Sequence, residues 1–328
     1  MWFEELTGFK ETTPDEVRAK LHLSGSTLTS RVNGGSWNCG TLEVVSLNTL
    51  RERAESAARS GGLRVAQQVA DVQKLHADSA NTGALFQVAS QFNLLEMVGP
   101  SVTPEQGVGI YELDFTQGPA CAIAAGAGTI YRNYFAPTRD GTGQSATSQI
   151  DCLEDMGAAL GNIGGRLWRM RNGYALPSLE GLREISRMLQ GATEAERDRL
   201  RGLLKIGVQW QTQVTLPGCA HEVSQVYCSA LPVAYCGHPA DDWKELATLI
   251  LEAAYEATLH AAVLNAQRTG NNTVYLTLLG GGAFGNEGSW ILSAIERALQ
   301  IHAHSALDVR LVSFQFPNPE LEPLCTEN

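Results

Sequence analysis

The chain has 328 residues, of which 44% are hydrophobic and 18% are charged, and its net charge is −11. This is an ordinary globular composition with enough length for a sizeable core, and the length alone would allow two domains. The negative charge argues against nucleic acid as a partner, because loose binding to phosphates needs a basic surface.

The sequence shows no sign of a membrane segment or of an oxidising compartment. It has no run of about 18 apolar residues that would span a bilayer, and the acidic segment after Met1 lacks the apolar region of a signal peptide. The seven cysteines are scattered, and none belongs to a C-x-x-C pair. We therefore expect reduced thiols, a cytoplasmic location and no membrane partner.

Residues 1–62 are expected to form a peripheral extension. Within them, Thr13 suits a helix N-cap and Pro14 the first helical position. Residues 41–45 predict a short strand and residues 46–58 a helix that ends before two glycines. The following residues, up to Ala70, are compatible with either a strand or a helix.

The next informative stretch predicts a buried strand over residues 85–89. Ser90, Gln91 and Asn93 stand at its carboxyl end. Polar side chains there are costly unless they are paired, and ligands of open α/β sheets bind at that end. The alternative is that one of these side chains caps the helix that follows.

A connection that carries three acids comes next, over residues 96–114. The acids are Glu96, Glu105 and Asp114, and we expect another strand over residues 109–115. Gly118-Pro119 then begins a helix made almost entirely of small residues. Small side chains would let this helix approach either a ligand or its neighbouring elements, and its N-terminus could receive an anion.

Residues 136–215 change character and are expected to form a mostly helical insertion outside the main sheet. A polar loop leads into amphipathic helices over residues 179–189 and 194–204, whose Arg and Glu side chains predict a solvated face. A strand over residues 209–216 would end this segment.

The last third of the chain alternates strands and helices. Short β-prone runs over residues 222–235 precede a long helix over 243–265, and strands over 274–279 and 308–316 flank a helix that starts near Trp290. Strands separated by helices imply a mostly parallel sheet with helices on both faces. The predicted fold class is therefore α/β.

The stretch that most strongly indicates a ligand is the glycine-rich loop after the strand at 274–279. It contains Gly280, Gly281, Gly282 and Gly285. A strand, a glycine loop and a helix together offer bare backbone N–H groups and a helix N-terminus to an anion, usually a phosphate. The alternative is a tight turn that needs glycine for steric reasons alone.

Several kinds of chemistry lack their motifs. No H-E-x-x-H, C-x-x-C or G-x-S-x-G is present, so we expect neither a metal site nor a serine hydrolase. The glycine loop lacks the Lys and Ser/Thr of a P-loop and is not the G-x-G-x-x-G of a nicotinamide enzyme. Carboxylates near a diphosphate pocket would serve glycosidic chemistry. Glu105 and Asp114 are favoured because they bracket the strand expected at 109–115, although each could be an exposed loop charge.

The order of these features resembles a macrodomain, the ADP-ribose-binding fold, over about residues 64–135 and 219–318. Asn93 is similar to the family's strand-end Asn, and Asp71-Val72 to the early dipeptide whose Asp holds the adenine. Phe314 or Phe316 is similar to the aromatic residue that covers the adenine. Two segments are similar to the loops that hold the diphosphate: Gln117, Gly118, Pro119 and Ala120, which lack the family's glycine run, and Gly281, Gly282, Ala283, Phe284, Gly285 and Asn286.

This resemblance implies one macrodomain-like domain over residues 1–328, a three-layer α/β/α fold with a mixed, mostly parallel sheet. The long connection between Asn93 and Gly118 departs from ordinary macrodomains. It resembles the divergent macrodomains, known from bacterial effectors, that remove ADP-ribose from arginine. That likeness implies that Glu96, Glu105 and Asp114 are the catalytic set, that neither a metal nor a cofactor is used, and that an ADP-ribosylated protein is the partner.

The sequence therefore predicts a hydrolase that releases ADP-ribose from an N-glycosidic link, with arginine as the expected attachment. Two alternatives stay open. One is a non-catalytic reader of ADP-ribose, whose acids would lie in an exposed loop. The other is a sugar-nucleotide or other phosphate-ester enzyme on a similar scaffold.

Overall fold

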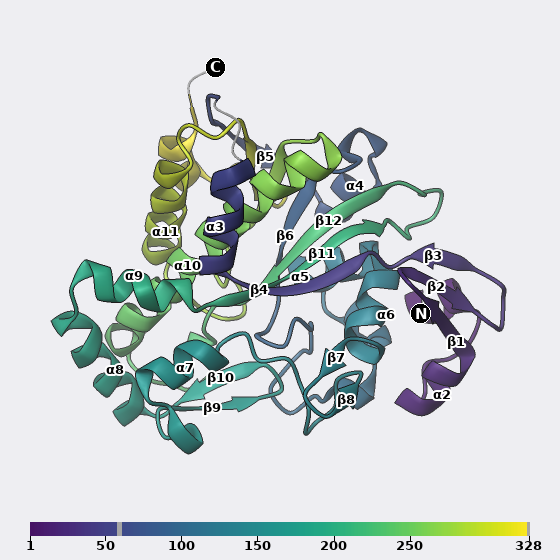
Figure 1. Cartoon of the computed structure of the whole chain (residues 1–328), viewed down its shortest axis with the longest axis horizontal. Helices are drawn as coiled ribbons and strands as arrows, with labels where there is room; N and C mark the ends of the chain where they lie inside the picture. The colour runs from purple at the N-terminus through teal and green to yellow at the C-terminus, as the bar shows by residue number, and fades with distance from the viewer. Residues whose placement is uncertain (58–60, 327–328) are drawn as a thin grey trace.

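A mixed sheet of seven strands forms the centre of the protein in the computed structural model, which describes residues 1–57 and 61–326 (Figure 1). The strands, in spatial order, are β4 (Thr41–Ser46), β11 (Lys205–Gln213), β12 (Glu222–Cys228), β6 (Leu85–Ala89), β13 (Thr273–Leu276), β14 (Asp308–Ser313) and β5 (Arg64–Val69). The five strands from β12 to β5 are parallel to one another, whereas β11 is antiparallel to both β12 and β4. The sheet is therefore mixed and mostly parallel, as expected.

Helices cover both faces of this sheet. On one face lie α10 (Ala240–Thr269), α11 (Gly288–Ile301) and α3 (Leu47–Ala57), and on the other lie α4 (Val72–Ala77), α5 (Gln117–Ala124) and α6 (Gly126–Tyr134). Neighbouring residues on β6 point to opposite layers, as the pleat of a strand requires. The ring of Phe86 stacks on His76 of α4, and the Gln87 side chain donates to Thr258 of α10. The expected three-layer α/β/α fold class is confirmed.

The N-terminal part folds into a small unit beside α6 (Figure 1). It consists of α1 (Trp2–Thr7), α2 (Pro14–Lys20) and a three-stranded sheet of β1 (Leu21–Ser24), β2 (Thr27–Ser30) and β3 (Ser36–Asn38). Thr13 caps α2 and Pro14 starts it, as predicted. The extension is shorter than residues 1–62, because β4 belongs to the central sheet and α3 packs on α10.

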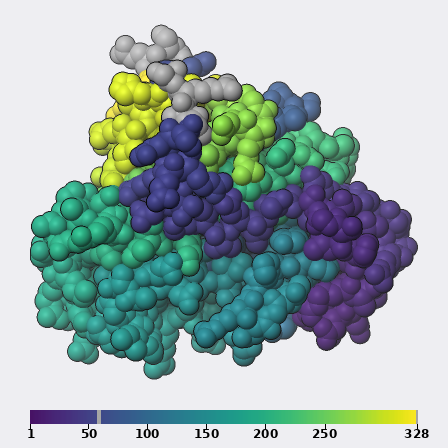
Figure 2. Space-filling view, in the orientation of Figure 1, coloured from purple at the N-terminus to yellow at the C-terminus, as the bar shows by residue number. Residues whose placement is uncertain are grey.

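The insertion is also smaller than residues 136–215, since β11 is a strand of the central sheet. The helices and the second hairpin of that segment lie at the end of the molecule opposite the N-terminal unit, whereas its first hairpin, over residues 137–142, lies beside that unit (Figures 1 and 2). It holds the two predicted helices and two unpredicted hairpins. Its elements are β7 (Pro137–Thr138), β8 (Gly141–Thr142), α7 (Glu154–Leu160), β9 (Trp168–Arg171), β10 (Tyr174–Pro177), α8 (Leu179–Gly191) and α9 (Glu194–Gly202).

Three further predictions were wrong. Residues 109–115 are not a strand: η3 (Gly109–Leu113) is a 3-10 helix whose first N–H group binds a side chain instead of a neighbouring strand. The small-residue helix is broken at Ala125, which separates α5 from α6. The second β-prone run at 222–235 ends in a 3-10 turn, η5.

The 3-10 helices are η1 (Ser79–Asn81), η2 (Pro104–Gln106), η3, η4 (Ile163–Gly165), η5 (Val233–Tyr235) and η6 (Pro319–Leu324).

Helix α10 is the central helix of the fold. Its 30 residues are long and apolar enough to cross a membrane by length and composition, but 83% of its most apolar window is buried inside the protein. Such burial is what a core helix packed between a sheet and other helices shows.

Candidate functional site

Two adjoining cavities open at the carboxyl ends of the parallel strands. The larger measures about 850 Å³ and is mostly apolar, and we call it the aromatic cavity. The smaller measures about 220 Å³ and contains two carboxyl groups, and we call it the acid cavity. Because both are lined by Asp114, Thr116, Gln117, Thr277 and Leu278, they form one continuous cleft. This is the edge of the sheet at which α/β proteins bind ligands.

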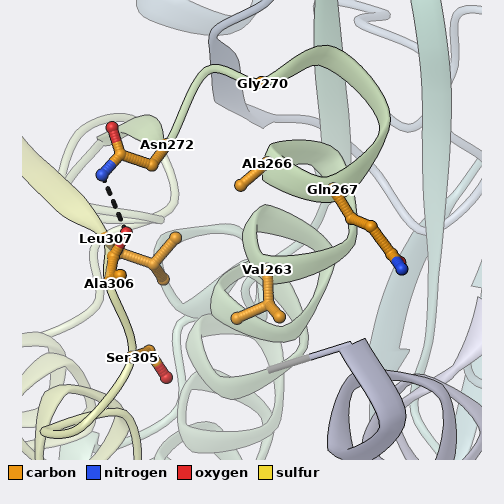
Figure 3. A pocket seen from close by; sticks show the side chains of 8 residues that line it. All are labelled: Val263, Ala266, Gln267, Gly270, Asn272, Ser305, Ala306 and Leu307. Atoms are coloured by element: carbon orange, nitrogen blue, oxygen red, sulfur yellow. Dashed lines mark hydrogen bonds between the residues drawn. The ribbon is translucent and has the colours of Figure 1, made fainter. Parts of the chain in front are cut away.

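A third cavity, of about 230 Å³, lies at the opposite edge of the sheet between α10 and the segment before β14 (Figure 3). Its walls are mainly Ala, Gly, Val and Leu, with one hydrogen bond across it from Asn272 Nδ2 to Ala306 O. It has no titratable side chain and therefore offers no acid–base chemistry.

The aromatic cavity is built where β5 and β14 end. Asp71 and Val72 begin α4 after β5, and Asp71 caps that helix by accepting a hydrogen bond from Gln73 N at 2.8 Å. After β14, Phe314 and Phe316 leave 66% and 74% of their surfaces exposed. Flat apolar rings left exposed over a cavity, next to a carboxylate, are what a flat polar heterocycle needs for stacking and hydrogen bonding.

The glycine-rich loop borders the acid cavity and not the aromatic cavity. Gly282, Ala283 and Phe284 line the acid cavity, whereas Gly281, Gly285 and Asn286 do not. Asn286 shapes the loop instead, because its Nδ2 donates to Leu231 O at 2.8 Å and to Gly280 O.

Gly280, the first glycine of this loop, is required by its surroundings. It has a φ of 76°, and a Cβ on it would overlap Ala230. The steric interpretation is therefore confirmed at Gly280, and ligand binding by the loop stays a prediction.

The N-terminus of α5 faces the glycine loop across the cleft. Gly118 and Pro119 line the acid cavity, Ala120 lines the aromatic cavity, and Gln117 lines both. The Gln117 side chain ties this helix to the end of β6, since it accepts from Ala89 N at 3.0 Å and donates to Gln87 O at 2.8 Å. Two backbone segments, the start of α5 and residues 282–284 of the glycine loop, thus line the same cleft.

Glu96 is the most unusual side chain of the cleft. It is only 4% exposed, lines the acid cavity, and its Oε1 has no hydrogen-bond partner among the described residues. Burial raises its pKa well above the usual range; Arg132 opposes that shift and the Asp114 charge adds to it. A buried carboxyl group without a partner is costly, and such groups cluster at functional sites.

Gly118 makes this approach of Glu96 possible. A Cβ at position 118 would overlap both Ala89 O and the Glu96 carboxyl group. The glycine is therefore needed for close packing between the start of α5, the end of β6 and the acid.

Asp114 is the second acid of the cleft and lines both cavities. It is partly exposed, and its Oδ1 accepts a hydrogen bond from Thr116 N at 2.9 Å. The two acids therefore differ in environment, with one carboxyl group buried and the other partly solvated.

Glu105, the third predicted acid, lies outside the cleft. It is exposed, and its Oε1 accepts a hydrogen bond from Ala146 N at 2.8 Å. It lines a separate surface cavity with residues of the 138–148 loop. Glu105 therefore does not join Glu96 and Asp114 in this structure, because it lies in η2 and its carboxylate is hydrogen-bonded to the 138–148 loop.

Asn93 also lies outside the cleft. It is fully buried, and its Nδ2 donates to Gln149 Oε1 at 2.9 Å. The chain turns at Leu94, which has a φ of 66°, so Asn93 faces the insertion while Glu96 faces the acid cavity. The expected contact between Asn93 and a ligand is therefore not possible in this conformation.

Three aromatic contacts in the acid cavity could not be predicted from the sequence. Tyr174, Tyr235 and Phe284 pack together with ring centroids 5.3 to 5.7 Å apart. The Tyr174 hydroxyl donates to Met97 O at 2.6 Å, next to Glu96. Only Phe284 belongs to a recognisable motif, the glycine-rich loop. Tyr174 lies in β10 of the insertion, and Tyr235 lies in η5.

The part of the chain that the structure describes contains no group of three or more His, Cys, Asp or Glu side chains that could hold a metal ion. No protein-family model matches the chain, and no curated protein matches it in sequence.

Solved structures of similar shape are poly(ADP-ribose) glycohydrolases. One from Deinococcus radiodurans, in complex with ADP-ribose, is 13% identical, covers 87% of this chain and 95% of its own, and has a TM-score of 0.48. One from Thermomonospora curvata, bound to the inhibitor ADP-HPD, is 10% identical, covers 93% of this chain and 92% of its own, and has a TM-score of 0.42.

Proposed function

We propose that the cleft binds an ADP-ribose unit and that the protein hydrolyses the glycosidic bond of its terminal ribose. The observation that carries this proposal is the buried Glu96 carboxyl group, whose Oε1 has no partner among the described residues, at one end of a cleft whose other end holds exposed aromatic rings. A glycine loop and a helix N-terminus lie between these ends, as a diphosphate would require.

In the proposed complex the adenine lies in the aromatic cavity. Phe314 or Phe316 covers its face, and Asp71 accepts from its amino group. The diphosphate lies between the backbone of residues 282–284 and the start of α5. The terminal ribose then faces Glu96 and Asp114 in the acid cavity.

The two acids suit the two tasks of glycoside hydrolysis. The bond to the leaving atom breaks as the anomeric carbon gains positive charge, and water adds to that carbon. Glu96, whose pKa burial raises, carries the proton that a leaving atom needs. Asp114, which is partly solvated, stabilises the developing positive charge and orients the water. This reaction uses water and no cofactor.

For the linkage we propose arginine as the first candidate, with an ADP-ribosylated protein as the substrate. Asp114 supports it, because a partly exposed carboxylate at the cleft pairs well with a guanidinium group. Glu96 favours a second candidate, an O-glycosidic link, since a protonated buried acid is the group that an oxygen leaving atom requires.

The test is a binding panel followed by a cleavage panel. Calorimetry should give ADP-ribose clearly tighter binding than ATP, NAD or UDP-sugars. Cleavage should then be measured on Arg-, Ser- and Glu-linked ADP-ribose and on ribose-linked oligomers. Binding of ADP-ribose without turnover of any substrate would identify a non-catalytic reader, and preference for another nucleotide would overturn the proposal altogether.

A further inference from the structure

A partly buried carboxylate of the N-terminal unit, that of Glu11, lies at the start of η3, the 3-10 helix before Asp114. Glu11 Oε1 accepts from Val108 N at 2.8 Å, and its Oε2 accepts from Gly109 N at 2.5 Å. The Tyr134 hydroxyl of α6 also donates to Oε1, at 2.7 Å. Three donors thus compensate a carboxylate whose burial would otherwise be costly.

Two glycines make room for this carboxylate. Gly107 has a φ of 84°, and a Cβ on either Gly107 or Gly109 would overlap the Glu11 carboxylate. The backbone at 107–109 therefore follows the shape of the Glu11 side chain. Glu11 and Val108 are separated by 97 positions in the sequence.

The 3-10 helix that Glu11 holds is in contact with both acids of the cleft. Tyr111, only 1% exposed, accepts a hydrogen bond through its hydroxyl from Glu96 N at 3.0 Å. Asp114 directly follows the helix, and its N–H donates to Tyr111 O at 3.1 Å. A shift of this helix would therefore move Glu96 and Asp114 together.

The same N-terminal unit packs around the Glu96 backbone. Leu95 and Met97, which flank Glu96, belong to a second hydrophobic core with Phe3 and Phe9. Trp2 adds two hydrogen bonds to the region of η3: its N–H donates to Glu112 Oε2, and its indole donates to Val108 O. Trp2 also lines the aromatic cavity.

We propose that Glu11 is a positioning residue for the proposed reaction, through which the N-terminal unit holds the two acids of the cleft in their reactive places. This inference rests on the proposed function. Glu11 itself touches neither cavity. The unit is thus a working part of the catalytic site and not a peripheral extension, in contrast to the expectation from the sequence.

The test compares Glu11→Gln with Asp15→Asn, a surface carboxylate of the same unit whose side chain is 93% exposed. Glu11→Gln keeps the shape but turns an amide donor toward one of the two backbone N–H groups. We expect kcat to fall roughly 10- to 100-fold, because a misplacement of about 1 Å at a reacting group costs that much. The affinity for ADP-ribose should change less than about threefold, since the aromatic cavity is intact, and Asp15→Asn should leave both unchanged.

Tyr134→Phe is the second variant, in case Glu11→Gln does not fold. It removes one of the three donors and should lower kcat by a smaller factor with the same unchanged affinity. A lower melting temperature with an unchanged kcat in the folded variants would show a purely structural role and overturn the inference.

Amide hydrogen exchange separates this inference from the proposed function. Glu11→Gln should speed exchange at residues 94–97 and 109–114, with little change at the glycine loop. This readout needs no turnover, so it holds even if wild-type protein cleaves none of the substrates. Unchanged exchange at 94–97 would refute the coupling whatever the reaction is.

Discussion

The two cavities of the cleft are built in different ways. The groups of the aromatic cavity proposed to hold the adenine directly follow strands, with Asp71 two residues after β5 and Phe314 one residue after β14. The acid cavity receives its carboxyl groups from the irregular connection between β6 and α5, and its tyrosines from the insertion and η5. One half of the site follows from the topology of the sheet, and the other half depends on contacts between distant segments.

The difference extends to exposure. The rings of the aromatic cavity are mostly solvent-exposed, whereas Glu96 is nearly fully buried and its backbone is held by Tyr111 and by the packing of Leu95 and Met97. Binding tolerates mobile rings, while proton transfer needs a carboxyl group held within hydrogen-bond reach. We therefore expect changes in the aromatic cavity to affect affinity and changes in the acid cavity to affect the rate.

The largest expected effect comes from Glu96→Gln. Loss of the proton donor should lower kcat on the order of 10²- to 10⁴-fold, while ADP-ribose binds with nearly unchanged affinity. The matched control is Glu105→Gln, which removes the acid that the sequence favoured but the structure places on the surface. Steady-state kinetics of both variants on one substrate shows which of the two glutamates the reaction needs. A strong loss of rate in Glu105→Gln would show that the surface position of Glu105 is not the catalytic conformation.

The second effect concerns affinity. Stacking of a base on an aromatic ring contributes about 1–3 kcal/mol, so removing the ring that covers the adenine should raise Kd for ADP-ribose roughly 5- to 150-fold. Calorimetry on Phe314→Ala and Phe316→Ala identifies which ring this is. At saturating substrate, kcat should stay near the wild-type value. Ile163→Ala, which changes an 82% exposed apolar residue outside the cleft, is the control. A fall in kcat with unchanged Kd in both phenylalanine variants would contradict the assignment of affinity to the aromatic cavity and of rate to the acid cavity.

The contrast also explains which parts were predictable from the sequence. The strands β6, β13 and β14, the long helix α10 and the helix start at Gly118 carry local patterns of hydrophobicity, glycine and proline, and the structure has them. The convergence of Asp71 and Phe316 on one cavity follows from parallel strands that end at one edge.

The connection at 90–116 carries no such pattern. Its path depends on Glu11 at its later part, on Gln149 beside Asn93, and on the core shared with Phe3. These contacts join residues that the sequence does not relate. Asn93 and Glu105 were therefore misplaced, and Tyr174 and Glu11 were missed.

The smallest expected effect is on stability, and it tests the burial of Glu96 without any assay of activity. Burial raises the folded-state pKa of Glu96, so the folded protein keeps the proton after the unfolded chain has lost it. Below the ordinary pKa of a glutamate, Glu96 is protonated in both the folded and the unfolded state, so its ionisation does not lower the free energy of unfolding. As the pH rises from there toward the folded-state pKa, the unfolded state gains stability relative to the folded state. Glutamine at this position has no such penalty.

Glu96→Gln should therefore raise the melting temperature relative to wild type more at pH 8 than at pH 5, as measured by calorimetry in matched buffers. An equal difference at both pH values would mean that the Glu96 carboxyl group ionises normally in the folded protein, and the acid cavity would then lack its proton donor.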